Sequence, residues 1–183
     1  MLYVPPISDY KPFYIQFASG DAKDIKTVYS VVIKAHDYPS AFKVKEPYKN
    51  QWHDEHGDDE YISASGLYVD AFTFKLECAM FSRNTTEALA IQDLQAGLSA
   101  FRTALLQGHF KTYDAWTGFG FQKVRLQEFP NVDPSNYSVW ESYSGSVNSG
   151  SIRGCTRLIF PVTLKVNDPV THMVLSGTNI VAG

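Results

Sequence analysis

The chain has 183 residues, of which 44% are hydrophobic and 14% aromatic, and a formal net charge of −3. This length and composition are typical of one globular domain and exclude a disordered chain. The mixed charge does not favour a nucleic-acid-binding protein, which usually carries a basic patch. Residues 1–6 lack a signal-peptide pattern and no apolar run reaches membrane-helix length, so we expect a soluble protein.

The first sixty residues give weak periodicity. Residues 1–12 contain three prolines, which exclude a regular helix and predict an extended arm. Residues 13–18 and 25–33 are rich in β-branched and aromatic side chains, and together they predict an N-terminal hairpin. Residues 36–60 show no period, which predicts a long loop of the kind that is functional or disordered.

Stronger patterns follow. The side chains of residues 72–80 alternate between apolar and polar, which predicts a strand with one wet face. Residues 85–107 predict an amphipathic helix with Asn84 as cap, Glu87 completing a capping box and Gly108 just beyond the end. Its apolar stripe, at spacings of three and four, consists of Ile91, Leu94, Leu98, Phe101 and Leu105.

Further strands are predicted over 110–116, 119–129 and 156–166. A loop covers 130–150, with a short strand candidate at 137–143, and the residues from Ser176 onward predict a flexible tail. The economical architecture is one α+β domain over 1–183, with its core in 13–175: an antiparallel sheet with one main amphipathic helix packed on one face, an extended N-terminal arm and long loops at 36–60 and 130–150.

Two cysteines, Cys78 and Cys155, lie on apolar rows of predicted strands. Free cysteine packs as a small hydrophobic residue, so both are expected to be buried thiols. A disulfide would require the two strands to be neighbours in a suitable register. Unpaired thiols indicate synthesis in a reducing compartment.

Residues 53–60 (HDEHGDDE) hold two histidines and five carboxylates. They match neither the alternating ligands of an EF-hand loop nor the usual spacing of a zinc site, so we expect a solvated acidic loop or a partner-facing surface, with no metal and no cofactor. Asp70, Glu77, Asp114 and Glu128 are candidates for catalytic pairing, but the sequence does not show that any two are close. We therefore assign no catalytic residue.

Aromatic side chains gather near the ends of the predicted strands. They exceed what one helix needs for packing, and such an excess is typical of a subunit interface. These residues are Tyr61, Tyr68, Tyr113, Trp116, Phe119, Phe121 and Phe129.

Three segments carry a resemblance to a known family. Residues 56–61 (HGDDEY), 113–118 (YDAWTG) with 122–125 (QKVR), and 162–170 (VTLKVNDPV) resemble small proteins from the tail regions of Bacteroidetes phages and prophages. The match covers roughly residues 50–172. The order strand, helix, strands is also similar to the tail-terminator (tail-completion) proteins of long-tailed phages. That resemblance implies a sheet with a packed helix and a hexameric ring that caps the tail tube.

The resemblance implies a non-enzymatic structural virion protein, made in the host bacterial cytoplasm and located in the tail or neck. Its partners would be copies of itself in a hexameric ring and other tail or neck proteins, with no membrane and no sequence-specific nucleic acid. Alternatives are another neck or tail-tube protein, a metal-dependent hydrolase using residues 53–60, and a carbohydrate- or ligand-binding module on the aromatic-rich sheet. The interaction candidates are Tyr61, Tyr113, Trp116, Phe119, Asp58, Asp59 and Glu60.

Overall fold

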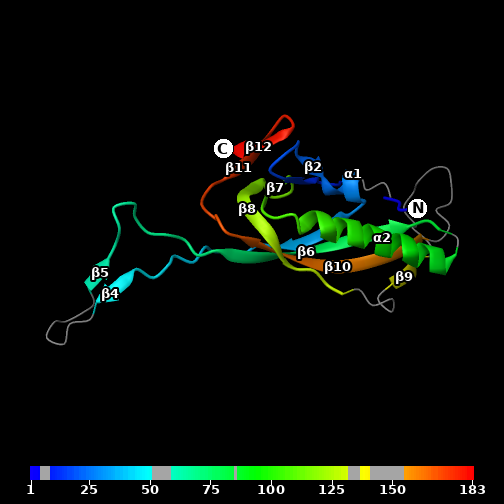
Figure 1. Cartoon of the computed structure of the whole chain (residues 1–183), viewed down its shortest axis with the longest axis horizontal. Helices are drawn as coiled ribbons and strands as arrows, with labels where there is room; N and C mark the ends of the chain where they lie inside the picture. Colours follow the sequence, from blue (N-terminus) through cyan, green and yellow to red (C-terminus); the bar gives the residue numbers. More distant parts are fainter. Residues whose placement is uncertain (5–8, 51–58, 85, 132–136, 141–154) are drawn as a thin grey trace.

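The computed structural model describes residues 1–4, 9–50, 59–84, 86–131, 137–140 and 155–183. Most of the predicted loop at 130–150 and most of the acidic cluster at 53–60 therefore lie outside the described residues, but β9 (Tyr137–Trp140) falls on the short strand predicted within that loop. In Figure 1 the described chain forms a sheet-based body from which one thin arm projects.

One antiparallel sheet of eight strands makes up the body, in the spatial order β2-β1-β7-β8-β10-β6-β3, with β9 also paired to β10. These strands are β1 (Phe13–Gln16), β2 (Lys23–Asp24), β3 (Val32–Asp37), β6 (Phe72–Ser82), β7 (Phe110–Asp114), β8 (Phe119–Glu128), β9 (Tyr137–Trp140) and β10 (Cys155–Val166). The two long strands β6 and β10 pair in register from Phe72 opposite Val166 to Ser82 opposite Thr156. Both were predicted by their alternating side chains, and both predictions are confirmed.

Helix α2 (Glu87–Leu105) lies over β6 and β10 (Figure 1). Its side chains Leu94, Leu98 and Phe101 are buried, with Leu98 only 8% exposed. The predicted helix and its buried stripe are therefore confirmed. Gly97 allows close packing, because a Cβ there would come within 2.7 Å of the Met80 methyl group.

The start of α2 differs from the prediction. Its N-cap is Thr86, whose side chain makes no capping hydrogen bond. Asn84 does not cap the helix, because its amide donates instead to the Asp93 carboxylate at 2.6 Å. The Met1 amine contacts the same carboxylate. Asp93, about one and a half turns into α2, therefore binds the polar side chain that the local sequence pattern assigned to the cap.

The single strand predicted over 25–33 is also wrong in its first half. Residues Ile25–Tyr29 form the short helix α1, because the Asp24 side chain accepts a hydrogen bond from the Lys26 backbone N–H at 3.1 Å. The helix ends at Ser30, whose φ of 56° is left-handed. Strand β3 then pairs with β6 rather than with β1, so there is no hairpin of the predicted kind.

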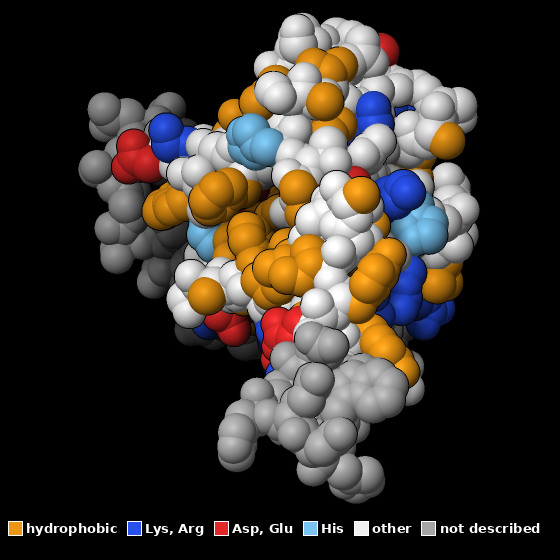
Figure 2. Space-filling model, turned by 90° about the vertical axis from the view of Figure 1, so that its left-hand side faces the viewer, with side chains coloured by type: hydrophobic (Ala, Val, Ile, Leu, Met, Phe, Trp, Pro, Cys, Tyr) orange, Lys and Arg blue, Asp and Glu red, His pale blue; other side chains and the backbone are white. Residues whose placement is uncertain are grey.

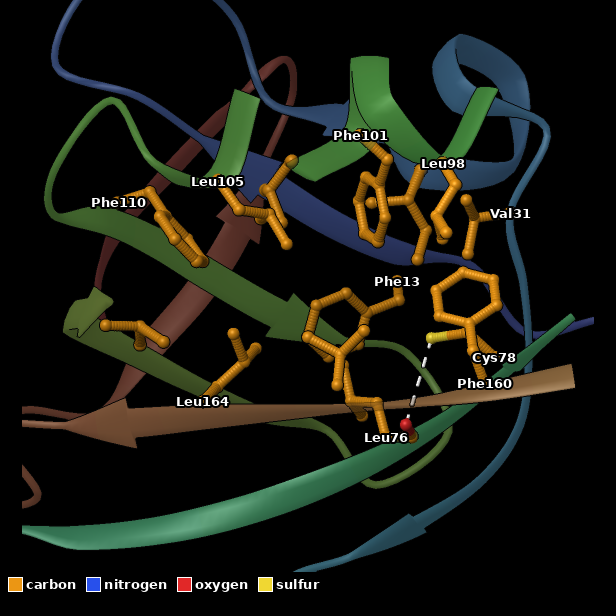
Figure 3. Close-up of a cluster of buried hydrophobic side chains, with 14 of the residues drawn as sticks. Phe13, Val31, Leu76, Cys78, Leu98, Phe101, Leu105, Phe110, Phe160 and Leu164 are labelled. Atoms are coloured by element: carbon orange, nitrogen blue, oxygen red, sulfur yellow. Dashed lines mark hydrogen bonds between the residues drawn. The ribbon is translucent and has the colours of Figure 1, made fainter. Parts of the chain in front are cut away.

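The hydrophobic core fills the space between α2 and the inner face of the sheet (Figure 3). Phe13, Phe110 and Phe160 come from three different strands and are all at most 2% exposed. Cys78 is a buried free thiol whose Sγ lies 3.9 Å from the Leu76 carbonyl oxygen. Burial raises the pKa of this thiol far above its usual range. The prediction of a buried thiol is confirmed for Cys78; the Cys155 side chain lies outside the described part.

The α+β class predicted from the sequence is wrong. The described part of the chain is mostly antiparallel β-sheet, with 47% of its residues in strands and 17% in helices, and it contains two helices, not one. The error arose where strands lack a clean apolar alternation. The predicted loop at 36–60 contains the end of β3 and two further strands, and the predicted tail contains a hairpin.

That C-terminal hairpin joins β11 (Met173–Ser176) to β12 (Asn179–Ala182). Ile180 is fully buried, and its backbone N–H donates to the Gln16 side-chain oxygen at 2.7 Å. The hairpin packs so closely that a Cβ on Gly120 would lie 2.3 Å from the Met173 carbonyl oxygen. A flexible tail after Ser176 is therefore the wrong prediction.

The N-terminal segment also lies on the body. The Tyr3 N–H donates to the Phe81 carbonyl at 2.9 Å, and Tyr3, Val4 and Tyr10 pack over Val32 and Phe81 on the outer face of the sheet. The described residues of the predicted arm at 1–12 thus cover this chain's own apolar surface. Their order does not require a neighbouring subunit.

Candidate interaction surface

Residues 38–50 and 59–71 form the described part of an arm that leaves the body after β3 and returns to it at β6 (Figure 1). Strands β4 (Tyr48–Asn50) and β5 (Asp59–Tyr61) pair antiparallel toward its far end. Nearer the body, Val44 and Val69 lie opposite each other, flanked by two interstrand backbone hydrogen bonds of 2.7 Å each. The arm thus contains the short β4–β5 pair and, nearer the body, a separate bridge, both joined by backbone hydrogen bonds.

The arm exposes apolar side chains along much of its length. Tyr48 and Tyr61 lie directly opposite each other and are 74% and 71% exposed. Further exposed apolar residues on the arm are Phe42, Val44, Ile62, Leu67 and Tyr68. A two-stranded ladder without a core is marginal in water, and exposed apolar patches mark interaction sites. The exposed apolar side chains therefore make the arm a candidate interaction surface.

The base of the arm is fixed by aromatic packing. Phe42 on the arm stacks against Phe72 at 5.5 Å between ring centroids, and Phe72 contacts Phe121 of the body at 5.4 Å. Tyr38 lies against Phe74 at 4.7 Å. Viewed from the arm side, hydrophobic side chains gather in several patches across the middle of this face of the molecule (Figure 2). The arm therefore extends the apolar surface of the body.

Asp114, at the end of β7, ties the arm base to the next turn. Its carboxylate is 4% exposed and accepts hydrogen bonds from the Tyr38 hydroxyl at 3.1 Å and from the Trp116 backbone N–H at 2.8 Å. The His36 Nδ1 lies 3.6 Å from it. Burial, and then the Asp114 charge, raises the pKa of Tyr38, so its hydroxyl stays protonated and donates.

The turn between β7 and β8 presents two aromatic side chains. Trp116 is 67% and Phe119 is 52% exposed. Gly118 has a φ of +74°, which a residue with a side chain adopts only under strain, and its N–H donates to the Asp114 carbonyl at 2.8 Å. Phe119 also lies 6.4 Å from the Tyr38 ring. One buried carboxylate thus positions both the turn and the start of the arm.

The predicted interaction residues fall into two groups. Tyr61 and Glu60 lie on β5, where Glu60 pairs with Lys49 at 3.3 Å; the Asp59 side chain and all of Asp58 lie outside the described part. Trp116 and Phe119 lie on the β7–β8 turn, and Tyr113 lies on β7 next to Tyr14, at 6.5 Å between ring centroids.

The sequence patterns indicated neither the cluster of His36, Tyr38 and Asp114, which we call the hub, nor most of the arm. His36, Tyr38 and Asp114 come from segments 76 residues apart, so no local pattern could join them. Phe42 and Tyr48 lie in residues 36–60, which show no alternation, and Leu67 lies between that segment and the strand predicted over 72–80. A usable signal was present: apolar residues are frequent in the arm although the segment has no amphipathic period that would bury them.

The described residues give little support for a metal site or for paired catalytic carboxylates. No group of three His, Cys, Asp or Glu side chains there is placed to hold a metal ion, while residues 53–58 are outside it. The four carboxylates considered for catalysis have separate surroundings: Glu77 pairs with Lys34 at 2.8 Å, Glu128 accepts from Thr163 at 3.4 Å and Asp114 is buried, as described above. Asp70 lies at the arm base.

One hollow of about 580 Å³ lies beside the hub, between the N-terminal segment and β3. Phe13 and Val32 form part of its apolar lining, while Lys34, His36 and Trp116 contribute polar or aromatic groups. It offers room for a side chain or a small ligand. The Asp114 carboxylate already accepts hydrogen bonds from Tyr38 and Trp116, which hold it in a positioning role. The described lining of this hollow therefore offers no nucleophile beside a base that could activate it.

No helix in the described ranges combines the length and apolar character needed to cross a membrane. Comparison of the chain with family models, with curated proteins and with solved structures returns no match in any of the three.

Proposed function

We propose that this protein is a non-enzymatic structural subunit of a tailed-phage virion. Copies of it assemble into a ring, hexameric in stoichiometry, at the head–tail or tail-tube junction, where they also contact other tail or neck proteins. The observation that carries the proposal is the projecting arm, whose exposed tyrosines, Tyr48 and Tyr61, lack a core of their own. The resemblance of residues 56–61, 113–118 and 162–170 to phage tail-region proteins supports the virion role.

The two groups of exposed side chains support assembly because they lie on different parts of one molecule. A contact between unlike surfaces is heterologous, and repeating it generates a closed ring when the rotation closes. Trp and Tyr are the side chains that most often anchor such interfaces. Aromatic packing at the arm base fixes the direction of the arm, which reduces the entropy lost when it docks. A neck or tail-tube subunit would use the same contacts.

The test is the assembly state of the full-length chain. Wild-type protein should form a ring of defined mass by light scattering and a closed annulus by electron microscopy. The double variant Tyr48→Ser/Tyr61→Ser should remain folded but lose the ring. The control Leu106→Ser removes an apolar side chain that is 65% exposed at the end of α2, and it should assemble normally. A wild-type chain that stays monomeric and never joins a particle contradicts the proposal.

A further inference from the structure

A hollow of about 480 Å³ lies where the arm leaves the sheet, and lysines dominate its charge. Lys43 and Lys45 come from the first strand of the arm, and Lys165 comes from β10. Asp70 is the one carboxylate among its described lining residues. We call this site the basal hollow.

The sheet adds to the positive charge of the basal hollow. Arg125 of β8 lies directly opposite Lys165 in the antiparallel register, and like charges in this position repel each other. The Arg125 guanidinium donates to the Leu126 carbonyl at 3.0 Å, not to a carboxylate. Among the described residues, no carboxylate forms an ion pair with Lys43, Lys45 or Lys165. An anionic partner would remove this repulsion.

The sequence between β4 and β5 carries the opposite charge. The chain around the connection from β4 to β5 contains five carboxylates, Asp54, Glu55, Asp58, Asp59 and Glu60. Only Glu60 has a described ion pair, with Lys49 at 3.3 Å, and Lys49 is the sole lysine of β4. The segment 53–60 is therefore complementary in charge to the basal hollow.

The geometry makes this complementarity intermolecular. Val44 of the bridge with Val69 lies six residues before Asn50, and Val69 lies ten residues after Asp59, with a turn at residues 63–66 in between. In Figure 1 the arm extends away from the body rather than turning back toward it. The described strands β4 and β5, which flank the acidic residues in the sequence, thus lie away from the sheet that carries their own basal hollow, so we take the basal hollow of a second copy as the docking site.

We propose that the acidic segment 53–60 of one copy docks in the basal hollow of the next copy. This inference rests on the proposed ring and identifies the contact that sets its direction. Each copy donates one arm end and accepts another, so the contact is heterologous and propagates around a ring. A nucleic acid is the less suitable occupant, because the carboxylates on the same arm would repel its phosphate backbone.

Charge reversal on each side tests the contact. The base variant is Lys43→Glu/Lys45→Glu/Lys165→Glu, and the end variant is Asp54→Lys/Asp58→Lys/Asp59→Lys. Each alone should weaken ring formation about tenfold or more, because like charges then face each other. An equimolar mixture should assemble again, since each reversed hollow then meets a reversed arm end. Light scattering and native mass spectrometry report the assemblies, and thermal unfolding confirms that each variant is folded.

The matched control Lys11→Glu/Lys23→Glu/Arg102→Glu changes the net charge of the chain as much as the base variant but leaves the basal hollow intact. It should assemble like the wild type. Wild-type rings that are insensitive to both reversals, or not restored by mixing, overturn this inference and leave the proposed function standing. Absence of any wild-type assembly overturns both. Binding of a DNA duplex that the base variant alone abolishes, with assembly unchanged, assigns the hollow to nucleic acid and also overturns the inference.

Discussion

The body and the arm of this protein are built on opposite principles. The body buries large side chains such as Phe74, Phe110 and Phe160 between a sheet and a helix, and its strands support one another. The arm has a similar antiparallel ladder, yet its side chains Tyr48 and Tyr61 lie in solvent. The same backbone pattern therefore serves two purposes. In the body it is stabilised by a buried core, whereas in the arm it leaves apolar side chains exposed.

The sharpest way to break this comparison is to truncate the same side chain in both regions. Leu98→Ala in α2 should lower the free energy of unfolding by about 2–5 kcal/mol, because Leu98 is buried. Leu67→Ala on the arm, where the side chain is 54% exposed, should change it by less than about 0.5 kcal/mol. Urea denaturation of the dissociated chain measures both. Equal costs would show that the arm belongs to the cooperative core.

A second substitution asks whether the C-terminal hairpin belongs to the body. Gly120→Ala places a Cβ 2.3 Å from the Met173 carbonyl oxygen and 2.8 Å from the Thr112 carbonyl oxygen, and backbone atoms cannot easily move away. We expect a loss of about 1–3 kcal/mol by thermal unfolding, with faster amide exchange in β11 and β12.

The matched control is Gly97→Ala, whose new Cβ meets only the flexible ends of Leu2 and Met80. Alanine also favours the helix by about 1 kcal/mol, so the net cost should be smaller than at Gly120. If β11 and β12 keep their protection in Gly120→Ala, the hairpin is not held by this close approach.

A third substitution tests the connection between the two regions. Tyr38→Phe removes the hydroxyl that donates to the buried Asp114 carboxylate, and it should cost about 1–3 kcal/mol. Because this bond holds the arm base, amide exchange at Lys45 and Asp70 should accelerate more than in the body. Tyr10→Phe loses a comparable bond, to Asp24 at 2.8 Å, and should leave the arm unaffected. Unchanged exchange in the arm of Tyr38→Phe would mean that aromatic packing alone anchors it.

The smallest effect concerns the thiol of the core. Burial raises the pKa of Cys78, so the folded thiol stays protonated where an exposed thiol ionises, at a pH of about 8.5. The unfolded chain loses this proton at a lower pH than the folded chain does. The free energy of unfolding should therefore decrease as the pH rises above about 8.5. Alkylation followed by peptide mapping should show Cys78 unmodified in the folded protein at this pH and modified in guanidinium chloride. Rapid labelling of the folded protein would show that the core opens readily.

Local periodicity determined the elements that bury a face against the core. The spacing of Leu94, Leu98 and Phe101 predicted the buried side of α2, and the alternation in residues 72–80 predicted β6. Periodicity works there because a buried face must repeat with the geometry of its helix or strand. The same reasoning failed for β4 and β5, since a ladder without a core imposes no apolar alternation. It therefore underestimated the strand content and gave the wrong fold class.

Only the tertiary structure decided the remaining features. The Asp114 carboxylate meets Tyr38 across 76 positions of sequence, and Gln16 holds the hairpin at Ile180 across 164. A sequence pattern shows which side chains of a segment must be buried or hydrogen-bonded. The order of strands in the sheet decides which distant segment supplies the partner, because it places residues that are far apart in the chain within hydrogen-bonding distance.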